Sequence, residues 1–440
     1  MERLWIAGGR VVDPASGRDE VADVLVEGGR IVAVARGMRP GGASVLDARS
    51  LVVAPGLVDL HVHLRDPGQT HKEDIASGTR AAARGGVTSV VCMANTKPPV
   101  DDPVVVEYIR SRAREAGAVR VYPVGAVTKG LEGKELSPIG ALATAGVVGL
   151  SDDGRPISDA GLLRRAMLYS RMFDLPILEH CEDPSLSAGG VMHEGEVSVR
   201  LGLRGIPRSA EEVVVARDLV LAEETGAHVH IQHVSTRGSV RLIREAKTRG
   251  VRVTAEVTPH HLALTDESLE GYDPNFKMNP PLRSAEDVEA LLEGLRDGTL
   301  DCIATDHAPH APAEKLVEFD AAPFGVIGLE TLLGVVLTRL VWQEGWPLGR
   351  ALSLVTDRPA RILGLPGGRL QAGAPADLVL LDPGREWVVD PDRFHSKSRN
   401  TPFGGWTLRG RVLATLVEGR VVWMEEEEKA RLLPVGSGAE

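Results

Sequence analysis

The sequence predicts an α/β protein, a (β/α)8 TIM barrel that carries a small β-sandwich-like domain, and three observations support this fold. Apolar, β-branched runs alternate with Ala-, Leu- and Glu-rich helical stretches through the middle of the chain, as in a parallel sheet connected by helices. Eight such units follow one another over about 310 residues, the usual content of a closed barrel. Short strands broken by Gly and Asp turns fill both ends of the chain instead.

Size and charge narrow the possible functions. At 440 residues, with 43% hydrophobic and 25% charged residues, the chain can form one large core and a smaller second domain. Its net charge of −11 argues against nucleic acid or an anionic membrane as a partner. An acidic substrate would therefore need a pocket with local positive charge.

The three cysteines indicate a reducing compartment. Cys92, Cys181 and Cys302 lie far apart in apolar contexts, which favours buried thiols of a cytoplasmic protein over a disulfide framework. The N-terminus lacks the apolar core of a signal peptide. No apolar run reaches the roughly 18 residues that a membrane span needs, so we expect no membrane segment.

The two chain ends are predicted to form one composite β domain from residues 1–54 and 366–440, and residues 55–365 to form the barrel. The segments VLVEGGRIVAV (24–34) and ATLVEGRVVWM (414–424) resemble each other, with apolar residues on both sides of a Glu-Gly turn. We therefore expect two similar hairpins in one sheet system.

Polar residues follow the predicted barrel strands where the strands end. The eight candidate strands are 56–64, 88–95, 120–127, 147–154, 176–182, 228–235, 251–261 and 301–310, with helices such as 73–86 and 209–226 between them. Nearly every strand begins apolar and ends in His, Asp, Asn or Lys. The carboxyl ends of barrel strands form the active face, so these side chains should converge. An open doubly wound sheet is the alternative fold, but it would not gather so many strand ends.

The first strand ends in an unusual pattern, DLHVHLRDPG. His61 and His63 lie two residues apart and so point to the same side of a strand, with Arg65 just beyond them. Two imidazoles suit a metal, and a guanidinium suits an anion. Taken alone, however, a buried His pair with satisfied hydrogen bonds explains the pattern equally well.

The remaining strand ends supply a full set of metal ligands. The candidates are His61, His63, Asn95, Asp152, Asp153, His180, His233, Asp306, His307 and His310. Four imidazoles and two carboxylates can hold two divalent ions if one group bridges them, and Zn²⁺ fits nitrogen and oxygen donors best. We expect one or two zinc ions, with two favoured, because paired ions lower the pKa of a shared water molecule.

Other residues of the same types are expected to be background. His230 has the opposite strand parity to His233 and is the weaker ligand, whereas His260 and His261 favour structural roles at the rim. Sequence alone does not separate Asp152 from Asp153.

The motifs PGLVDLHVHLRDPG, MANTKPP, SDDG, EHCED, QHVST, MNPPLR, ATDHAPH and PFGVIGLET together resemble bacterial type I dihydroorotases of the amidohydrolase superfamily. The resemblance covers nearly the whole chain, in order. It implies the reversible cyclisation of N-carbamoyl-L-aspartate to L-dihydroorotate in de novo pyrimidine (UMP) biosynthesis.

The resemblance also implies roles for the strand-end residues. His61, His63 and Asp306 would bind the first metal, His180 and His233 the second, and Asp153 would bridge the two. Asp306 would also act as the catalytic acid and base. Many relatives use a carboxylated lysine as the bridge, but residues 147–154 contain no lysine, which agrees with the type I pattern.

For the substrate, the resemblance implies that Arg65 grips a carboxylate with Asn95 and His310 as its partners, Arg65 and His310 adding positive charge. Asn279 would lie near the ring, as would the backbone of Phe324 and Gly325. Residues 308–325, rich in Pro and Ala, are predicted to form a loop that closes over substrate.

Two other functions stay open at this point. A cyclic amidohydrolase of another specificity, such as a hydantoinase or allantoinase, would share the fold but normally carries the bridging lysine. A barrel without catalysis could serve as a structural partner of aspartate transcarbamoylase. The resemblance makes a complex with that transcarbamoylase possible alongside catalysis, and we expect a homo-oligomer.

Overall fold

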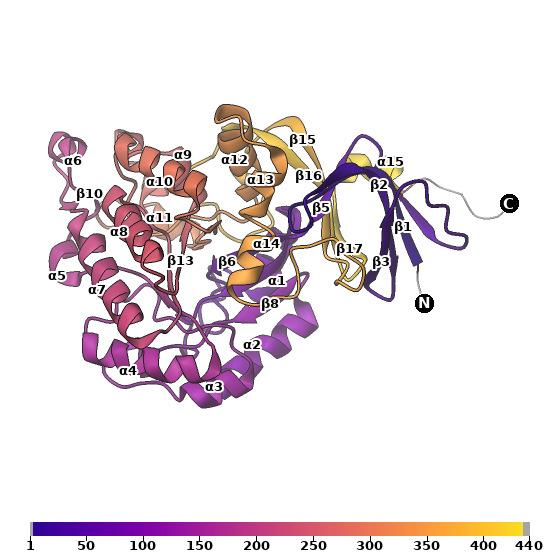
Figure 1. Cartoon of the computed structure of the whole chain (residues 1–440). Coiled ribbons are helices and arrows are strands. Elements are labelled where there is room, and N and C mark those ends of the chain that lie inside the picture. Colours follow the sequence, from indigo (N-terminus) through magenta and orange to yellow (C-terminus); the bar gives the residue numbers. More distant parts are fainter. Residues whose placement is uncertain (1–2, 434–440) are drawn as a thin grey trace.

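A computed structural model describes residues 3–433, so the outermost residues of the predicted β domain, 1–2 and 434–440, lie outside the described part. Figure 1 shows a barrel surrounded by helices and, at one end of the molecule, a β-sheet region that contains the first and the last of the described strands. The barrel strands are β6 (Leu57–Val62), β7 (Val87–Cys92), β8 (Arg120–Pro123), β9 (Ile177–Glu179), β12 (Val229–Ile231), β13 (Val253–Val257) and β14 (Cys302–Ile303). All pair in parallel.

Isolated bridges complete the ring. The fourth predicted strand contributes only Leu150, which bridges Gly125 on one side and Ile177 on the other. A bridge between Val62 and His307 joins the last strand to the first. The predicted (β/α)8 barrel is therefore confirmed, with a fourth strand that is shorter than the pattern suggested because the chain turns away at Ser151 to place two aspartates.

Helices cover the barrel on the outside (Figure 1). They are α1 (Ile75–Arg84), α2 (Pro103–Ala116), α3 (Ile139–Ala145), α4 (Ala160–Ser170), α7 (Ser209–Thr225), α8 (Arg237–Thr248), α10 (Ala285–Asp297), α12 (Leu332–Val336), α13 (Leu348–Ser353) and α14 (Asp357–Ile362). Aspartate caps start several of them; Asp74 accepts a hydrogen bond from the Ser77 amide at 2.7 Å and so fixes the start of α1. None of the described helices is long and apolar enough to cross a membrane.

Shorter elements fill the loops of the barrel. They are α5 (Pro184–Ser187), β10 (Met192–His193), α6 (Glu196–Leu201), β11 (Gly205–Ile206), α9 (Pro259–Ala263) and α11 (Pro312–Lys315). Of these, α9 and α11 follow strands β13 and β14 and lie at the carboxyl end of the barrel, where the strand-end residues gather.

The β region is one eight-stranded sheet with its own core. Its strands are β1 (Arg3–Asp13), β2 (Arg18–Glu27), β3 (Arg30–Ala35), β4 (Ser44–Asp47), β5 (Val52–Pro55), β15 (Leu378–Val388), β16 (Thr407–Val417) and β17 (Arg420–Met424). Antiparallel pairing of β5 with β15 joins the N-terminal strands to the C-terminal ones. Ile6, Val24, Leu378 and Leu413 belong to one buried cluster there. The two similar segments form the hairpins β2–β3 and β16–β17, while the domain boundaries themselves stay a prediction.

The chain between β15 and β16 leaves the sheet and reaches the barrel. The Ser396 hydroxyl donates a short hydrogen bond to Glu73, which precedes α1. The Asn400 amide donates to the carbonyl of Ala308, just after the last barrel strand. A C-terminal segment therefore contributes to the face of the barrel that carries the candidate site.

Candidate functional site

The strand-end residues meet around one cavity at the carboxyl end of the barrel. Each of the six predicted metal ligands is at most 8% exposed. The cavity has a volume of about 270 Å³ and is lined by His63, Arg65, Asn95, Asp153, Gly154, His180, His233, Asn279, Asp306, Ala308, His310, Phe324 and Gly325. His61 lies beneath it, fully buried. Every residue to which the resemblance assigned a role is therefore in or directly below this cavity, whereas the candidates Asp152 and His307 do not line it.

Three of the non-glycine residues that line the cavity have a positive backbone φ angle. The φ angles are 59° for Arg65, 33° for His233 and 48° for Asp306. Non-glycine residues rarely adopt positive φ, and such strain persists where the surrounding structure enforces it, often at functional sites. Here it turns the chain sharply at the ends of three strands and directs polar side chains to the cavity.

The two carboxylate oxygens of Asp153 face different histidine pairs. Oδ2 lies 3.4 Å from His61 Nε2 and 3.3 Å from His63 Nε2. Oδ1 lies 3.5 Å from His180 Nδ1 and 3.6 Å from His233 Nε2. One carboxylate thus stands between two pairs of imidazoles, as a bridging ligand would.

Asp306 completes one side of this cluster. Its Oδ1 lies 3.1 Å from His63 Nε2 and 3.5 Å from His61 Nε2. Burial alone would raise the pKa of Asp306, but the neighbouring imidazoles of His61 and His63 lower it below its usual range. Asp306 is therefore ionised at neutral pH.

The adjacent aspartates are clearly distinct in the structure. Asp152 points away from the cluster: its Oδ1 accepts hydrogen bonds from the amides of Val127 and Thr128 at 2.8 and 3.0 Å. Its Oδ2 accepts a short hydrogen bond from the Thr128 hydroxyl. Burial raises the pKa of Asp152 to about 6. Asp152 therefore fixes the loop after β8, and Asp153 alone of the two faces the histidines.

The cluster favours positive charge. Burial would lower the pKa of His61, yet Asp153 and Asp306 raise it well above its usual value. The pKa of His180 is raised to about 10, because contacts with Asp153 and Glu182 outweigh burial. The pKa of Asp153 lies well below its usual value, since the histidines outweigh its burial. A cation bound here would meet a field that already stabilises it.

The donor atoms fit a metal centre. His61 Nε2 and Asp153 Oδ1 are buried without a hydrogen-bond partner in the described part of the chain. Buried polar atoms are rarely left so, and metal ligation is one way to satisfy them. Three triads of the site bring one ligand atom from each member within 4.8 Å of the others: His61–His233–Asp306, His61–His63–Asp153 and Asp153–His180–His233. The last two share Asp153. A fourth triad of the same kind, His230–Glu256–Cys302, includes no residue that lines the cavity.

The other side of the cavity is basic. Arg65 Nε donates to the Pro309 carbonyl at 3.2 Å. Within residues 3–433 no carboxylate forms an ion pair with its guanidinium. Burial lowers the pKa of Arg65, whereas Asp306 and Asp153 act to raise it. A half-buried guanidinium in this state is prepared for an anion that enters the cavity.

His310 does not supply the positive charge that was expected of it. Burial and the nearby Arg65 lower the pKa of His310 to about 3, so the imidazole is neutral at neutral pH. Its Nε2 donates to the Phe324 carbonyl at 2.8 Å. The sequence could not show this because desolvation depends on how residues 308–325 fold back over the ring.

The two predicted asparagines contact other site residues. Asn95 Oδ1 lies 2.9 Å from His63 Nδ1, and its amide donates to the Asp153 carbonyl at 3.2 Å. Asn279 donates to Glu182 Oε2 at 2.8 Å, and the same oxygen lies 2.9 Å from His180 Nε2. Glu182 was not predicted, although its position two residues after His180 could have suggested it.

Two more buried residues were missed. Glu256 of β13 holds His61 Nδ1 at 2.8 Å, and its pKa falls to about 2 because His230 and His61 outweigh burial. Asn400 donates to the carbonyls of Ala308 and Gly325 at 3.1 and 3.0 Å and accepts from the His310 amide at 3.3 Å. The inward parity of Glu256 was a signal; nothing in the sequence pointed to Asn400.

The background histidines have structural contacts. His230 is hydrogen-bonded through both ring nitrogens, to Thr254 and Glu256. Both nitrogens of His261 are likewise bonded, to Thr258 and the Pro280 carbonyl. His260 Nε2 is buried without a partner in the described residues, and burial lowers the pKa of His260 to about 4.

Comparisons with known proteins agree with this geometry. The family described as Dihydro-orotase-like matches residues 50–239, and the Amidohydrolase family matches residues 201–423. A dihydroorotase from Pelotomaculum thermopropionicum is 56% identical over 423 residues, with 96% of this chain and 99% of that protein covered. A dihydroorotase from Anaeromyxobacter dehalogenans (strain 2CP-1) is 55% identical over 430 residues, with 97% and 99% covered.

Solved structures show the same fold. An L-hydantoinase (dihydropyrimidinase) from Arthrobacter aurescens superposes with a TM-score of 0.86 at 28% identity, covering 96% of both chains. A dihydropyrimidinase from Brevibacillus agri superposes with a TM-score of 0.84 at 23% identity, covering 95% of this chain and 94% of that one. The predicted family is thus confirmed: the chain belongs to the dihydroorotase family, within the amidohydrolases.

Proposed function

We propose that this protein is a dihydroorotase, which interconverts N-carbamoyl-L-aspartate and L-dihydroorotate in de novo pyrimidine (UMP) biosynthesis. The observation that carries the proposal is that two chemistries meet in one cavity. A cluster of histidines and aspartates lies on one side, and the Arg65 guanidinium, which forms no ion pair within residues 3–433, lies on the other. Full-length relatives at 49–56% identity bear the same name.

We assign the metal to the Asp153 cluster. His61, His63 and Asp306 would hold one zinc ion, and His180 and His233 a second, with Asp153 between them. Zinc suits this set of nitrogen and oxygen donors. Divalent ions bound there would lower the pKa of a water molecule and polarise the ring carbonyl.

The protein's own residues carry the proton and the orientation. In ring opening, a water molecule adds to the ring carbonyl carbon and ionised Asp306 accepts its proton. Asp306 then gives this proton to the ring nitrogen as the carbon–nitrogen bond breaks, and ring closure runs these steps in reverse and releases the water. Arg65 binds the substrate carboxylate and so aligns the ring with Asp306. Asn279 lies on the side of His180 and Glu182, where it can contact the ring.

The backbone at the end of the 308–325 loop has a more limited role than the resemblance implied. Gly325 donates its amide to the Lys277 carbonyl at 3.0 Å, so that group is already used. The Phe324 amide forms no hydrogen bond within residues 3–433 and is the donor that we assign to substrate. Gly325 has a φ of 129°, and a Cβ there would lie 2.9 Å from the Ala308 side chain, so only glycine lets the loop come this close.

The hydantoinase with the same fold suggests one competing specificity, the hydrolysis of an uncharged cyclic ureide. An uncharged cyclic ureide would leave Arg65 desolvated and unpaired, which disfavours it. No lysine stands in the fourth strand, where many of those enzymes carry the bridge.

A direct assay tests the proposal. Purified protein should hydrolyse dihydroorotate, and zinc measured in the same sample should reach at least one ion per chain. Full metal content without activity on dihydroorotate would contradict the substrate assignment. The same result would favour the non-catalytic role beside a transcarbamoylase.

We also propose that the chain forms homo-oligomers, associates with aspartate transcarbamoylase and works in the cytoplasm. The family resemblance supports the first two, and three free, buried cysteines support the third. Sedimentation of the protein alone and mixed with the transcarbamoylase tests both assemblies: a single monomer boundary in each case would contradict them.

A further inference from the structure

A buried carboxylate lies directly below the Asp153 cluster. Glu256 on β13 is fully buried, and each of its oxygens contacts a different histidine. Oε1 lies 2.8 Å from His61 Nδ1, and Oε2 lies 3.0 Å from His230 Nε2. Glu256 therefore connects a candidate metal ligand to a histidine that faces away from the cavity.

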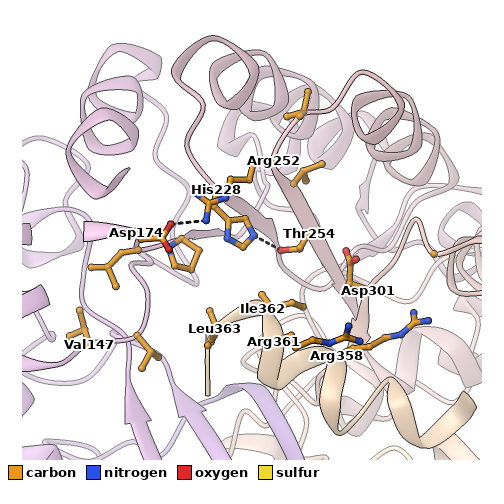
Figure 2. A pocket seen from close by; sticks show the side chains of 17 residues that line it. Val147, Asp174, His228, Arg252, Thr254, Asp301, Arg358, Arg361, Ile362 and Leu363 are labelled. Atoms are coloured by element: carbon orange, nitrogen blue, oxygen red, sulfur yellow. Dashed lines mark hydrogen bonds and ion pairs between the residues drawn. The ribbon is translucent and has the colours of Figure 1, made fainter. Parts of the chain in front are cut away.

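The contacts continue through the barrel to its opposite end. His230 Nδ1 lies 2.9 Å from Thr254 Oγ1, which lies 2.8 Å from His228 Nε2. His228 lines a second cavity, of about 900 Å³, at the amino ends of the strands. Figure 2 shows this cavity with His228 directed at Thr254 and Arg252 paired with Asp174. We call His228, Thr254, His230 and Glu256 the polar column.

Glu256 as a carboxylate accepts hydrogen bonds and does not donate them. When the rings of His61, His230 and His228 are neutral, the hydrogen bonds of the polar column are consistent with only one arrangement of protons. His61 Nδ1 and His230 Nε2 must then each carry a proton. His230 Nδ1 is left as an acceptor, so the Thr254 hydroxyl donates to it and in turn accepts from His228 Nε2. Burial lowers the pKa of His228 to about 4, which leaves its ring neutral, as this arrangement allows.

This arrangement decides the state of His61. In the neutral ring, the form that binds a metal, the proton is on Nδ1 and the lone pair is therefore on Nε2, the atom that is buried without a partner in residues 3–433 and faces Asp153 and Asp306. The Gln232 amide nitrogen also lies 3.2 Å from His61 Nδ1. A lone pair on Nδ1 would nevertheless face the Glu256 carboxylate at 2.8 Å, so the proton belongs there.

We propose that Glu256 and, through His230, Thr254 are positioning residues that lock His61 into the tautomer able to bind a metal through Nε2. The inference rests on the proposed function only in requiring that the Asp153 cluster holds a metal. Groups that orient a metal-bound histidine commonly change metal affinity 10- to 100-fold when they are replaced. The column thereby gives His228, at the far end of the barrel, an indirect contact with the site.

The test measures Zn²⁺ affinity of the full chain by competition with a chelator, with no substrate present. Glu256→Gln keeps the shape but offers an amide hydrogen to one histidine, so we expect Zn²⁺ to bind roughly 10- to 100-fold more weakly. Thr254→Val should weaken binding about fivefold, the effect of one neutral hydrogen bond, and Thr254→Ser should restore it.

Thr88→Val is the matched control. Thr88 is fully buried on β7 and donates to the Leu57 carbonyl at 3.3 Å, outside the polar column. The Thr88→Val variant should have a lower free energy of unfolding than the parent protein and the same Zn²⁺ affinity. If folded Glu256→Gln binds Zn²⁺ within twofold of the parent protein, the proposal is wrong. If that variant does not fold, equal affinities of Thr254→Val and Thr254→Ser overturn the proposal instead.

The result is independent of the substrate. Weakened Zn²⁺ binding in the Glu256 and Thr254 variants would support the positioning role even if the parent protein failed to hydrolyse dihydroorotate. Conversely, an active parent enzyme whose variants keep full Zn²⁺ affinity would leave the proposed function standing and remove the positioning role.

Discussion

The two ends of the barrel contrast in size and in the state of their charges. The amino-end cavity, of about 900 Å³, is more than three times as large as the carboxyl-end cavity, of about 270 Å³. Arg252 pairs there with Asp174 at 2.6 Å, and Asp301 with Lys247 at 2.7 Å, whereas Arg358 forms no ion pair within residues 3–433. At the carboxyl end, Arg65 forms no ion pair within residues 3–433, and two buried ligand atoms lack partners.

This difference shows that volume does not locate the chemistry of this protein. The chemistry is located by buried polar and charged groups that lack a partner, because each such group costs free energy unless a ligand binds to it. At the carboxyl end, three lining residues other than glycine have a positive φ: Arg65, His233 and Asp306. At the amino end, Asp174 is the one such residue among those that line the cavity.

The largest effect should come from Asp153→Ala. Asp153 is the carboxylate whose two oxygens face the two histidine pairs, so its removal should abolish turnover and most metal binding. Asp152→Ala is its neighbour control; it should lower the free energy of unfolding by about 1–3 kcal/mol through loss of buried hydrogen bonds while retaining metal. Metal analysis and thermal unfolding of both variants test which aspartate binds the metal. Metal loss in Asp152→Ala alone would reverse the assignment.

Asp306→Asn should come next. The amide can still offer an oxygen to a metal but cannot carry a proton, so we expect turnover to fall by at least about 10²-fold. Metal content should fall much less than in Asp153→Ala. Near-normal turnover in a variant with metal bound would remove Asp306 from the proton-transfer role.

Asn400→Ala should have a moderate effect. Its side chain ties Ala308, Gly325 and His310 together, so its loss should raise KM for dihydroorotate about 10-fold and change kcat less. Hydrogen exchange across residues 311–322 should quicken in the variant and, in the parent, slow when dihydroorotate binds. Asn275→Ala is the control, since that side chain forms no hydrogen bond within residues 3–433. Equal KM values in the two variants would show that Asn400 does not order the loop.

The smallest effect should come from the other end of the barrel. Arg358 lines the amino-end cavity and is half-buried, like Arg65. Arg358→Met should leave kcat/KM for dihydroorotate within about twofold, as surface changes away from a site usually do. If kcat/KM fell as much in Arg358→Met as in Arg65→Met, both ends of the barrel would contribute to catalysis, and the contrast between them would be wrong.

The sequence was sufficient to predict the elements whose signals are local. Alternating apolar and helical segments predicted the barrel. The rule that active residues follow parallel strands predicted that His61, His180 and Asp306 lie close together. Period-two spacing alone predicted that His61, in β6, and His63, directly after it, point to the same side.

What the sequence could not supply depends on contacts between distant segments. Asp152 and Asp153 are chemically identical neighbours, and only the amides of Val127 and Thr128 separate their roles. Asn400 enters the site from a C-terminal segment assigned to the β region. The neutral state of His310 depends on burial by its own loop, and burial has no local pattern in the sequence.

One measurement tests the central claim most directly: kcat/KM for dihydroorotate against dihydrouracil, in the parent protein and in Arg65→Met. A guanidinium that grips a carboxylate in a partly dry pocket contributes about 2–4 kcal/mol, or roughly 30- to 1,000-fold. The parent should therefore prefer dihydroorotate by at least about 10²-fold, and Arg65→Met should close most of that gap by impairing dihydroorotate alone. Comparable rates on both substrates in the parent would contradict the account and favour a hydantoinase.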